Sequence, residues 1–336
     1  MNYAVLGRTG LKAAAVSFGG IPIQRADAAN TRAVVDALEA HGINYIDTAR
    51  GYTVSEEYLG AALEGRRDKF ILATKSMART APAMAADVDT SLRNLRTGYI
   101  DLYQIHNLPE REIEQVFSPG GAYETLAAAR DAGKIGHIGV TAHSADALRV
   151  LLEQYSDQLE TVMFPFNIVE NQGVETLRLA RERGMGTIAM KPLAGGNLED
   201  YALALRYIAA AGVCDISIPG MGSPEEVDRN ASVDLSAPLT AEELSECEAI
   251  RRELGEHFCR RCGYCAPCTV GIDIPSNFLM ANYTRKYGLA DWARGRYEGL
   301  AHHASECVKC GACEKRCPYD LPIRQMLEGV AQVFGH

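Results

Sequence analysis

The sequence lacks long hydrophobic runs, and no stretch approaches the roughly 18 to 20 consecutive apolar residues of a transmembrane helix. Its opening residues, MNYAVLGRTG, also lack the positively charged head and apolar core of a secretory signal peptide, so we expect a cytoplasmic protein. Basic residues are outnumbered, and the net charge of −9 argues against binding to a nucleic-acid backbone. The composition of the 336 residues is otherwise that of a globular protein, and the length favours about two domains.

Cysteine is scarce in most of the chain, because only Cys214 and Cys247 precede residue 259. We expect these two thiols to be packed in apolar surroundings. The other eight of the ten cysteines lie in the last part of the chain. Since no secretory signal accompanies them, this density predicts metal binding in a reducing compartment and not a set of disulfides.

Short apolar runs alternate with helical patterns as far as residue 235, which indicates repeated βα units and a parallel sheet. The expected strands are Ala15–Phe18, Tyr45–Ile46, Phe70–Ala73, Leu102–Ile105, Ile138–Thr141, Thr161–Phe164, Thr187–Met190 and Ile216–Ile218. The expected helices lie near 27–41, 54–65, 83–96, 121–132, 145–155, 172–183 and 199–211. Eight strands in this length predict an α/β fold, a (β/α)8 TIM barrel over residues 1–235. A doubly wound sheet is the alternative, but no GxGxxG follows the first strand.

Three further segments flank this pattern. Residues 3–14 contain two short apolar runs around a glycine turn and predict an N-terminal hairpin. Residues 236–256 have one apolar side and predict a helical connector. Residues 257–336 hold the cysteines and form a separate, mainly helical unit in this interpretation.

Polar residues stand where three neighbouring strands of the expected barrel end. Asp47 and Tyr52 occur in IDTARGY, Lys75 in FILATKS and His106 in DLYQIHN. Because active sites of such barrels lie at the carboxyl ends of the strands, the four side chains are expected to converge.

The four residue types suit reduction of a carbonyl group. Hydride delivered to a carbonyl carbon leaves negative charge on the oxygen, which must be protonated or stabilised. Tyr52 would donate the proton, because a phenol with an ordinary pKa near 10 becomes a better acid beside an ammonium such as Lys75. Asp47 would keep that lysine charged and in place, and a neutral His106 would orient the substrate oxygen.

With these motifs the sequence resembles the aldo-keto reductase superfamily over about residues 3–235. IDTARGY, ATK and YQIHN stand where that family carries its Asp, Tyr, Lys and His tetrad. The resemblance implies that the hairpin plugs the bottom of the barrel. It also implies a nicotinamide nucleotide across the mouth, contacted by KPLAGG and by IPGMGSPEEVDRN. The implied cofactor residues are Thr141, His143, Asn167, Met190, Lys191, Pro192, Leu193, Gly220, Met221, Gly222, Glu226 and Asn230.

The sequence departs from the family pattern at two cofactor positions. The usual Ser-Asn pair after the fifth strand is replaced by Thr141, Ala142 and His143, and Met190 stands where an aromatic residue often stacks on the nicotinamide. Asn167 has an alternative role, because it would also suit the cap of the following turn.

The choice between the two nicotinamide cofactors depends on residues 220–230. Relatives that prefer NADP carry a basic residue here for the 2′-phosphate, whereas this chain has Glu225 and Glu226, which would repel it. We therefore expect NAD(H) to be favoured over NADP(H). Two observations support the alternative. The two glutamates also suit a solvated first helical turn, and Arg229 is a nearby partner for a phosphate.

The cysteine-rich region contains two closely spaced motifs. Cys307-x2-Cys310-x2-Cys313-x3-Cys317-Pro is the bacterial ferredoxin run, in which the fourth cysteine binds the other cluster of a two-cluster protein. The first motif, Cys259-x2-Cys262-x2-Cys265-x2-Cys268, differs in its last spacing. Eight cysteines suit two 4Fe–4S clusters, and exchange of the fourth ligands predicts two sets. These are Cys259, Cys262, Cys265 and Cys317, and Cys307, Cys310, Cys313 and Cys268.

This region resembles the helix-containing ferredoxins, and aldo-keto reductases with such a C-terminal domain form a recognisable subgroup. The alternatives are a single cluster with spare thiols or a zinc site formed by Cys259–Cys268 alone.

The function predicted from the sequence is reversible NAD(P)H-linked reduction of an aldehyde or ketone, with an alcohol as the substrate of the reverse direction. The clusters would be a structural support or an electron route to a protein partner, which would carry a basic patch to match the acidic chain. The alternative is a non-catalytic redox-sensing or electron-carrier subunit whose barrel binds nucleotide for regulation. No nucleic-acid or membrane partner is expected.

Overall fold

The structure is a computed structural model of the chain and describes residues 2–335. Met1 and His336, the outermost residues of the expected barrel and cysteine-rich regions, lie outside it. The chain forms two compact units. One holds the chain up to Leu193 together with Asp200–Leu239, and the other holds Ala194–Glu199 and the chain from Thr240 on. The boundaries at residues 235 and 257 remain predictions.

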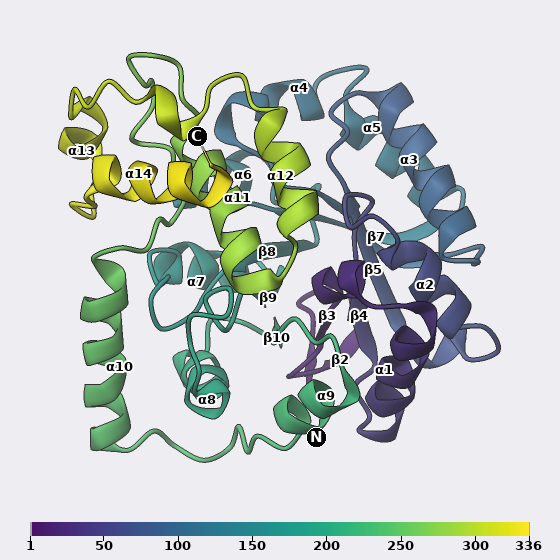
Figure 1. The fold of residues 1–336 in the computed structure, drawn as a ribbon. Coiled ribbons are helices and arrows are strands. Elements are labelled where there is room, and N and C mark those ends of the chain that lie inside the picture. The colour runs from purple at the N-terminus through teal and green to yellow at the C-terminus, as the bar shows by residue number, and fades with distance from the viewer. Residues whose placement is uncertain (1, 336) are drawn as a thin grey trace. The chain divides into compact units, whose positions relative to one another are not determined.

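The first unit is a parallel barrel of eight strands (Figure 1). Its strands occur in chain order around the sheet: β3 (Phe18–Gly19), β4 (Tyr45–Asp47), β5 (Ile71–Ser76), β6 (Ile100–Ile105), β7 (Ile135–Thr141), β8 (Thr161–Pro165), β9 (Gly186–Met190) and β10 (Ile216–Ile218). Parallel bridges from Val16 to Ser217 and from Gly19 to Gly220 join the first strand to the last. These bridges nearly close the sheet, and the predicted (β/α)8 barrel is confirmed.

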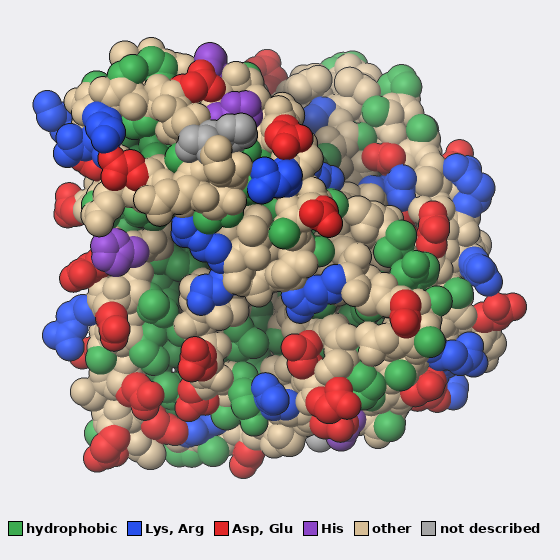
Figure 2. Space-filling view, viewed as in Figure 1, with side chains coloured by type: hydrophobic (Ala, Val, Ile, Leu, Met, Phe, Trp, Pro, Cys, Tyr) green, Lys and Arg blue, Asp and Glu red, His purple; other side chains and the backbone are tan. Residues whose placement is uncertain are grey.

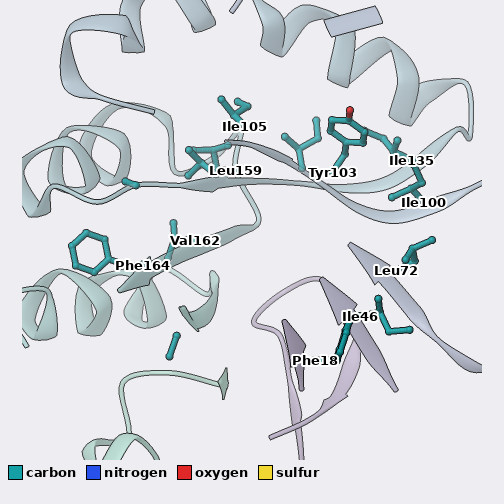
Figure 3. Packing of buried hydrophobic residues seen from close by; sticks show 14 of the residues in the cluster. Phe18, Ile46, Leu72, Ile100, Tyr103, Ile105, Ile135, Leu159, Val162 and Phe164 are labelled. Atoms are coloured by element: carbon teal, nitrogen blue, oxygen red, sulfur yellow. The ribbon is translucent and has the colours of Figure 1, made fainter. Parts of the chain in front are cut away.

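Helices follow the strands and cover the outside of the barrel. They are α1 (Ala28–Ala40), α2 (Ser55–Ala62), α3 (Ala81–Asn94), α4 (Ile113–Phe117), α5 (Ala122–Asp131), α6 (Ala145–Tyr155), α7 (Val174–Glu182), α8 (Tyr201–Ala211) and α9 (Pro224–Ala231). Apolar side chains fill the layer between strands and helices. Figure 3 shows Phe18, Ile46 and Leu72, which come from three adjacent strands, among them. The predicted helices agree with this order. Helix α4 was not predicted, and α9 begins with the helical turn of Glu225 and Glu226 that was considered as an alternative.

The first predicted strand differs most from the structure. Ala15–Phe18 was expected, whereas β3 is only Phe18–Gly19. Here the backbone pairs with two neighbours in turn, because Ser17 donates to the Ser217 carbonyl and Gly20 to the Asp47 carbonyl. Closing the barrel therefore divides this segment between two partners and leaves a short regular strand.

The N-terminal hairpin closes the end of the barrel where the strands begin. It consists of β1 (Tyr3–Val5) and β2 (Lys12–Ala14), which pair in antiparallel fashion. Gly7, whose φ of +46° suits glycine, pairs with Met185 next to the start of β9. The fully buried Leu6 packs with inward-facing side chains that include Tyr45 and Leu102. The hairpin does not cover the opposite end of the barrel, where the strands finish, and active sites of such barrels lie at that end.

The second unit is mainly helical. Its helices are α10 (Ala241–Gly255), α11 (Ile274–Tyr287), α12 (Ala290–Glu298), α13 (Ala312–Arg316) and α14 (Ile323–Phe334). Helix α10 begins with a capping box, in which Thr240 and Glu243 each bond the other's backbone amide. The buried side chains of α11 and α14 share one apolar cluster with several of the motif cysteines.

None of the helices in the described part of the chain combines the length and the apolar character needed to cross a bilayer. On the face drawn in Figure 2, acidic and basic side chains are interspersed.

Candidate functional site

The four residues of the predicted tetrad stand at the carboxyl ends of three adjacent strands. Asp47 is the last residue of β4, Lys75 is on β5, and His106 directly follows β6. Tyr52 lies in the loop between β4 and α2. Strand order thus brings together residues that are far apart in the sequence.

Asp47 and Lys75 form a buried ion pair, and each residue is only 2% exposed. The lysine Nζ also donates to the carbonyl of Thr48 at 2.8 Å, and Gln104 Nε2 donates to Asp47 Oδ1 at 3.3 Å. Burial raises the pKa of Asp47 and lowers that of Lys75, whereas attraction between the two charges opposes both shifts. The pair therefore holds the ammonium in one position within the barrel.

Tyr52 lies close to both this ammonium and His106. The Lys75 Nζ is 4.9 Å from the centre of the Tyr52 ring. The rings of Tyr52 and His106 meet edge to face, with centres 6.0 Å apart and planes at 85°. A phenol, an ammonium and an imidazole therefore share one small volume at the barrel mouth.

His106 is held in its neutral form. Burial, and then the charge of Lys75, lower the pKa of this imidazole well below its usual 6.5. Its Nδ1 is buried and has no hydrogen-bond partner in the described chain. A neutral imidazole can orient a substrate oxygen by hydrogen bonding, while a phenol beside an ammonium can exchange a proton with that oxygen.

The residues after β7 bond to the loop that follows His106. Thr141 Oγ1 accepts a hydrogen bond from the Asn107 amide at 2.7 Å, and His143 Nδ1 lies 2.8 Å from Asn107 Oδ1. Both predicted cofactor residues are therefore beside the tetrad, and they also fix the adjacent loop.

Asn167 adopts the capping role that was considered as its alternative. Its Oδ1 accepts from the amides of Val169 and Glu170 at 2.9 and 2.8 Å, and its Nδ2 donates to the Lys191 carbonyl at 2.9 Å. The side chain is fully buried. It joins the ends of β8 and β9, and Met190, the last residue of β9, is 9% exposed. The next predicted residues, Lys191, Pro192 and Leu193, leave that strand, with Lys191 at a φ of +54°.

Residues 220–230 form a turn and the first part of α9. Ser223 caps the helix and Pro224 occupies its first turn, so Glu225 and Glu226 lie in the first helical turn. The Glu226 carboxylate accepts the backbone amide of Gly222. Met221 is fully buried, and Asn230 Nδ2 donates to the Glu226 carbonyl.

Arg25 is a basic residue near this turn that was not predicted from the sequence. A Cβ built on Gly222 would be 3.6 Å from Glu226 Oε2 and 3.8 Å from Arg25 Nη2, so a carboxylate and a guanidinium flank the same glycine. Arg229, considered earlier for a phosphate, lies over the ring of Tyr201 at 5.4 Å. Arg25 follows the first strand without a recognisable motif, and only barrel closure brings it to Gly222.

Gln104 is the second residue that was missed, and the sequence contained a signal for it. Strand residues alternate between faces, and Leu102 points into the barrel interior. Gln104 follows on the same face and is fully buried, which brings its amide to Asp47.

The motif cysteines surround two cavities in the second unit. One cavity is lined by Cys259, Cys262, Cys265 and Cys317, and the other by Cys268, Cys307, Cys310 and Cys313. These are the two sets that follow from exchange of the fourth ligands. Cys268 lines the cavity of the second motif, so Cys259–Cys268 do not surround a common site as the zinc alternative requires. In the described chain no three Cys, His, Asp or Glu residues are grouped as for a single metal ion.

Several of the cysteine side chains are shielded from water, whereas Cys310 is exposed. All eight are free thiols, and burial raises the pKa of Cys259 to about 11 and that of Cys265 to about 12. These two thiols keep their protons at neutral pH unless a metal displaces them. At the other cavity, Thr269 Oγ1 lies 3.2 Å from Cys310 Sγ. Four cysteine sulfurs around each of two small cavities suit the four iron atoms of a cubane 4Fe–4S cluster.

Comparison with known proteins gives matches in both parts of the chain. Residues 15–202, more than half of the chain, match the aldo/keto reductase family, and residues 258–322 match the 4Fe-4S dicluster domain. L-galactose dehydrogenase of Arabidopsis thaliana is 28% identical over 73% of this chain and 92% of its own length. Aldo-keto reductase YhdN of Bacillus subtilis is 31% identical over 59% of this chain and 64% of its own length.

A solved structure has the same architecture. The holo form of aldo-keto reductase AKR11C1 from Bacillus halodurans superposes with a TM-score of 0.66 and 26% identity. The match covers 74% of this chain and 96% of that one.

Proposed function

Because the chain belongs to the aldo-keto reductase family and carries a C-terminal 4Fe-4S dicluster domain, we propose that it reduces an aldehyde or ketone with a nicotinamide nucleotide. In the reverse direction it would oxidise the corresponding alcohol. The observation that carries the proposal is the position of the buried Lys75 ammonium beside the Tyr52 ring, which also lies against the neutral His106.

Each tetrad residue has a distinct role in this proposal. The bound nicotinamide would supply or accept the hydride at the substrate carbon. Tyr52 exchanges the proton at the substrate oxygen, and the Lys75 ammonium favours loss of the phenol proton by stabilising negative charge on Tyr52. Asp47 holds Lys75, and His106 donates a hydrogen bond that orients the substrate oxygen.

We propose that NADH is favoured over NADPH. Support comes from the Glu226 carboxylate, which lies against the Gly222 amide where the adenosine end of the nucleotide would approach. The negative charge of this carboxylate would repel the 2′-phosphate of NADPH. Arg25 acts in the opposite direction, so we expect the preference to be moderate.

We further propose that the chain binds two 4Fe–4S clusters, one at each cysteine-lined cavity. Hydride transfer moves two electrons together and needs no iron, so the clusters would support the fold or pass electrons to a protein partner. The described cysteines form no disulfides, which suits a reducing compartment, and we propose a cytoplasmic location.

The test is turnover by the anaerobically purified protein. NADH oxidation is followed with a panel of aldehydes and ketones, and NAD reduction with L-galactose and other sugars, because relatives are named L-galactose dehydrogenase and 6-dehydroglucose reductase. We expect turnover that Tyr52→Phe lowers by roughly 10²- to 10⁴-fold. Full turnover by Tyr52→Phe would exclude the assigned acid/base. Nucleotide binding without turnover on any substrate would instead favour the non-catalytic subunit.

A further inference from the structure

A second set of charged residues lies on the outer side of the strands that carry the tetrad, facing the helices. Arg50 Nη1 donates to Glu56 Oε2 at 2.7 Å, and Arg50 Nε lies 3.5 Å from Asp87 Oδ1. Glu56 is 1% exposed. Burial of a carboxylate is costly unless its oxygens are paired, so a buried charge outside the reacting groups needs an explanation.

Glu56 is fully paired, and its partners come from three elements. Its Oε1 accepts from Thr74 Oγ1 on β5 and from Ser91 Oγ on α3, both at 2.8 Å. Its Oε2 accepts from Arg50 and, at 3.3 Å, from Asn94 Nδ2. The carboxylate therefore joins the loop after β4 to β5 and α3.

The network holds the residues immediately before and after Lys75 on β5. Thr74 bonds to Glu56, and Ser76 donates its hydroxyl to Asp87. Because side chains alternate along a strand, Thr74 and Ser76 point outward to these carboxylates while Lys75, between them, points inward to Asp47. Rotation or sliding of this part of β5 would break both outer bonds.

The same network closes the loop that carries Tyr52. Arg50 and Glu56 lie on either side of Tyr52, and their ion pair joins the two ends of the loop. The backbone amide of Arg50 donates to the Lys75 carbonyl at 2.9 Å, which ties the base of the loop to β5. Thr53, at a φ of +42°, keeps the turn tight.

We infer that Arg50 and Glu56 are positioning residues that set the separation between Tyr52 and Lys75. The bonds described above join them to the loop and the strand, and the charge of Glu56 also raises the pKa of Lys75. They act by fixing the loop and the strand from which those groups project. The inference rests on the proposed function, because its consequence for turnover requires Tyr52 to be the acid/base.

The test compares Arg50→Gln, Arg50→Lys and the milder Asp87→Asn with Arg66→Gln as a matched control. Arg66 is likewise mostly buried and paired with two carboxylates, Asp36 and Glu39, but away from the tetrad. Folded sites are counted by binding of NADH. We expect Arg50→Gln to lower kcat on the order of 10- to 100-fold, because small displacements of reacting groups are costly. Its KM for the carbonyl should change little.

Two further readouts separate positioning from general stability. The pH dependence of kcat should shift in Arg50→Gln, because the ammonium no longer acts on Tyr52 from a fixed distance. Amide hydrogen exchange should also rise in residues 48–56 of this variant and not in Arg66→Gln. Arg50→Lys should restore part of kcat, and Asp87→Asn should give a smaller loss.

The outcomes are distinct. Unchanged kcat and pH profile in Arg50→Gln, or unchanged exchange of residues 48–56, would overturn the inference. A wild-type protein without carbonyl turnover would refute the proposed function. Faster exchange of the Tyr52 loop would then still support the role of Arg50 in holding it.

Discussion

The ammonium of Lys75 lies 4.9 Å from the centre of the Tyr52 ring. The ion pair with Asp47 and the bond to the Thr48 carbonyl leave the ammonium little freedom to move away. The phenol is therefore beside a positive charge in surroundings that water screens weakly, where such a charge has a larger effect than at the surface. Since this charge is fixed in position, its removal should change the acidity of Tyr52 and with it the rate of proton exchange.

Replacement of Lys75 by Met should remove that effect and retain much of the side-chain volume. We expect the pH optimum for carbonyl reduction to move, and kcat at neutral pH to fall by roughly 10²- to 10⁴-fold, because the acid/base loses its electrostatic partner. The pH profile of kcat measures this. Lys69→Met is the control, because Lys69 is exposed and pairs with Glu39, away from the tetrad. Similar profiles for wild type and Lys75→Met would refute the role of the ammonium.

The cysteine sets can be tested separately. Cys317 belongs to the second motif but lines the cavity of the first, so Cys317→Ser and Cys262→Ser should perturb the same cluster. Cys310→Ser should perturb the other. Iron content and the electron paramagnetic resonance spectrum of the reduced protein measure this. Cys214→Ser, which lines neither cavity, should leave both signals intact. Shared effects of Cys317→Ser and Cys310→Ser on one signal would contradict the exchange of ligands.

Cofactor preference should depend on Glu226. We expect NADH to bind more tightly than NADPH, and Glu226→Gln to narrow the difference by roughly three- to tenfold, because one negative charge is lost near the 2′-phosphate. Glutamine can still accept the Gly222 amide, so the turn should persist. Dissociation constants for both nucleotides give the ratio. Glu225→Gln removes an equal charge from an exposed position in the same helical turn and should narrow the difference less. Tighter binding of NADPH by the wild type would contradict the proposal.

The sequence predicted most strands because their apolar runs are buried on both faces, as at β8 and β9, where every residue is buried. It indicated the first turn of α9 through Glu225 and Glu226 but not the rest of the helix, because its residues are mainly polar and its start depends on the Ser223 cap. Asp47, Lys75 and His106 followed from strand ends, and Tyr52 from the loop just beyond one of them. The partners of the side chains were harder to predict from the sequence. Asn167 suited both a ligand contact and a cap, and Arg25 meets Gly222 only when the barrel closes.

His106 should make stability depend on pH. Burial holds its folded-state pKa well below the usual 6.5, so the unfolded chain binds a proton on this residue more readily than the folded chain. The free energy of unfolding should therefore rise with pH up to about 6.5. Below that value, this one group should contribute a slope of up to about 1.4 kcal/mol per pH unit.

His106→Gln should flatten that slope. The comparison is the free energy of unfolding from urea titrations between pH 5 and 8, followed by circular dichroism. His257→Gln, at an exposed position, should keep the wild-type slope. If His106→Gln and wild type lose stability equally as the pH falls, His106 is not the buried neutral group that the site requires. His106 would then need a different role from orienting a substrate oxygen, because a protonated imidazole at this position would be repelled by the positive charge of the Lys75 ammonium.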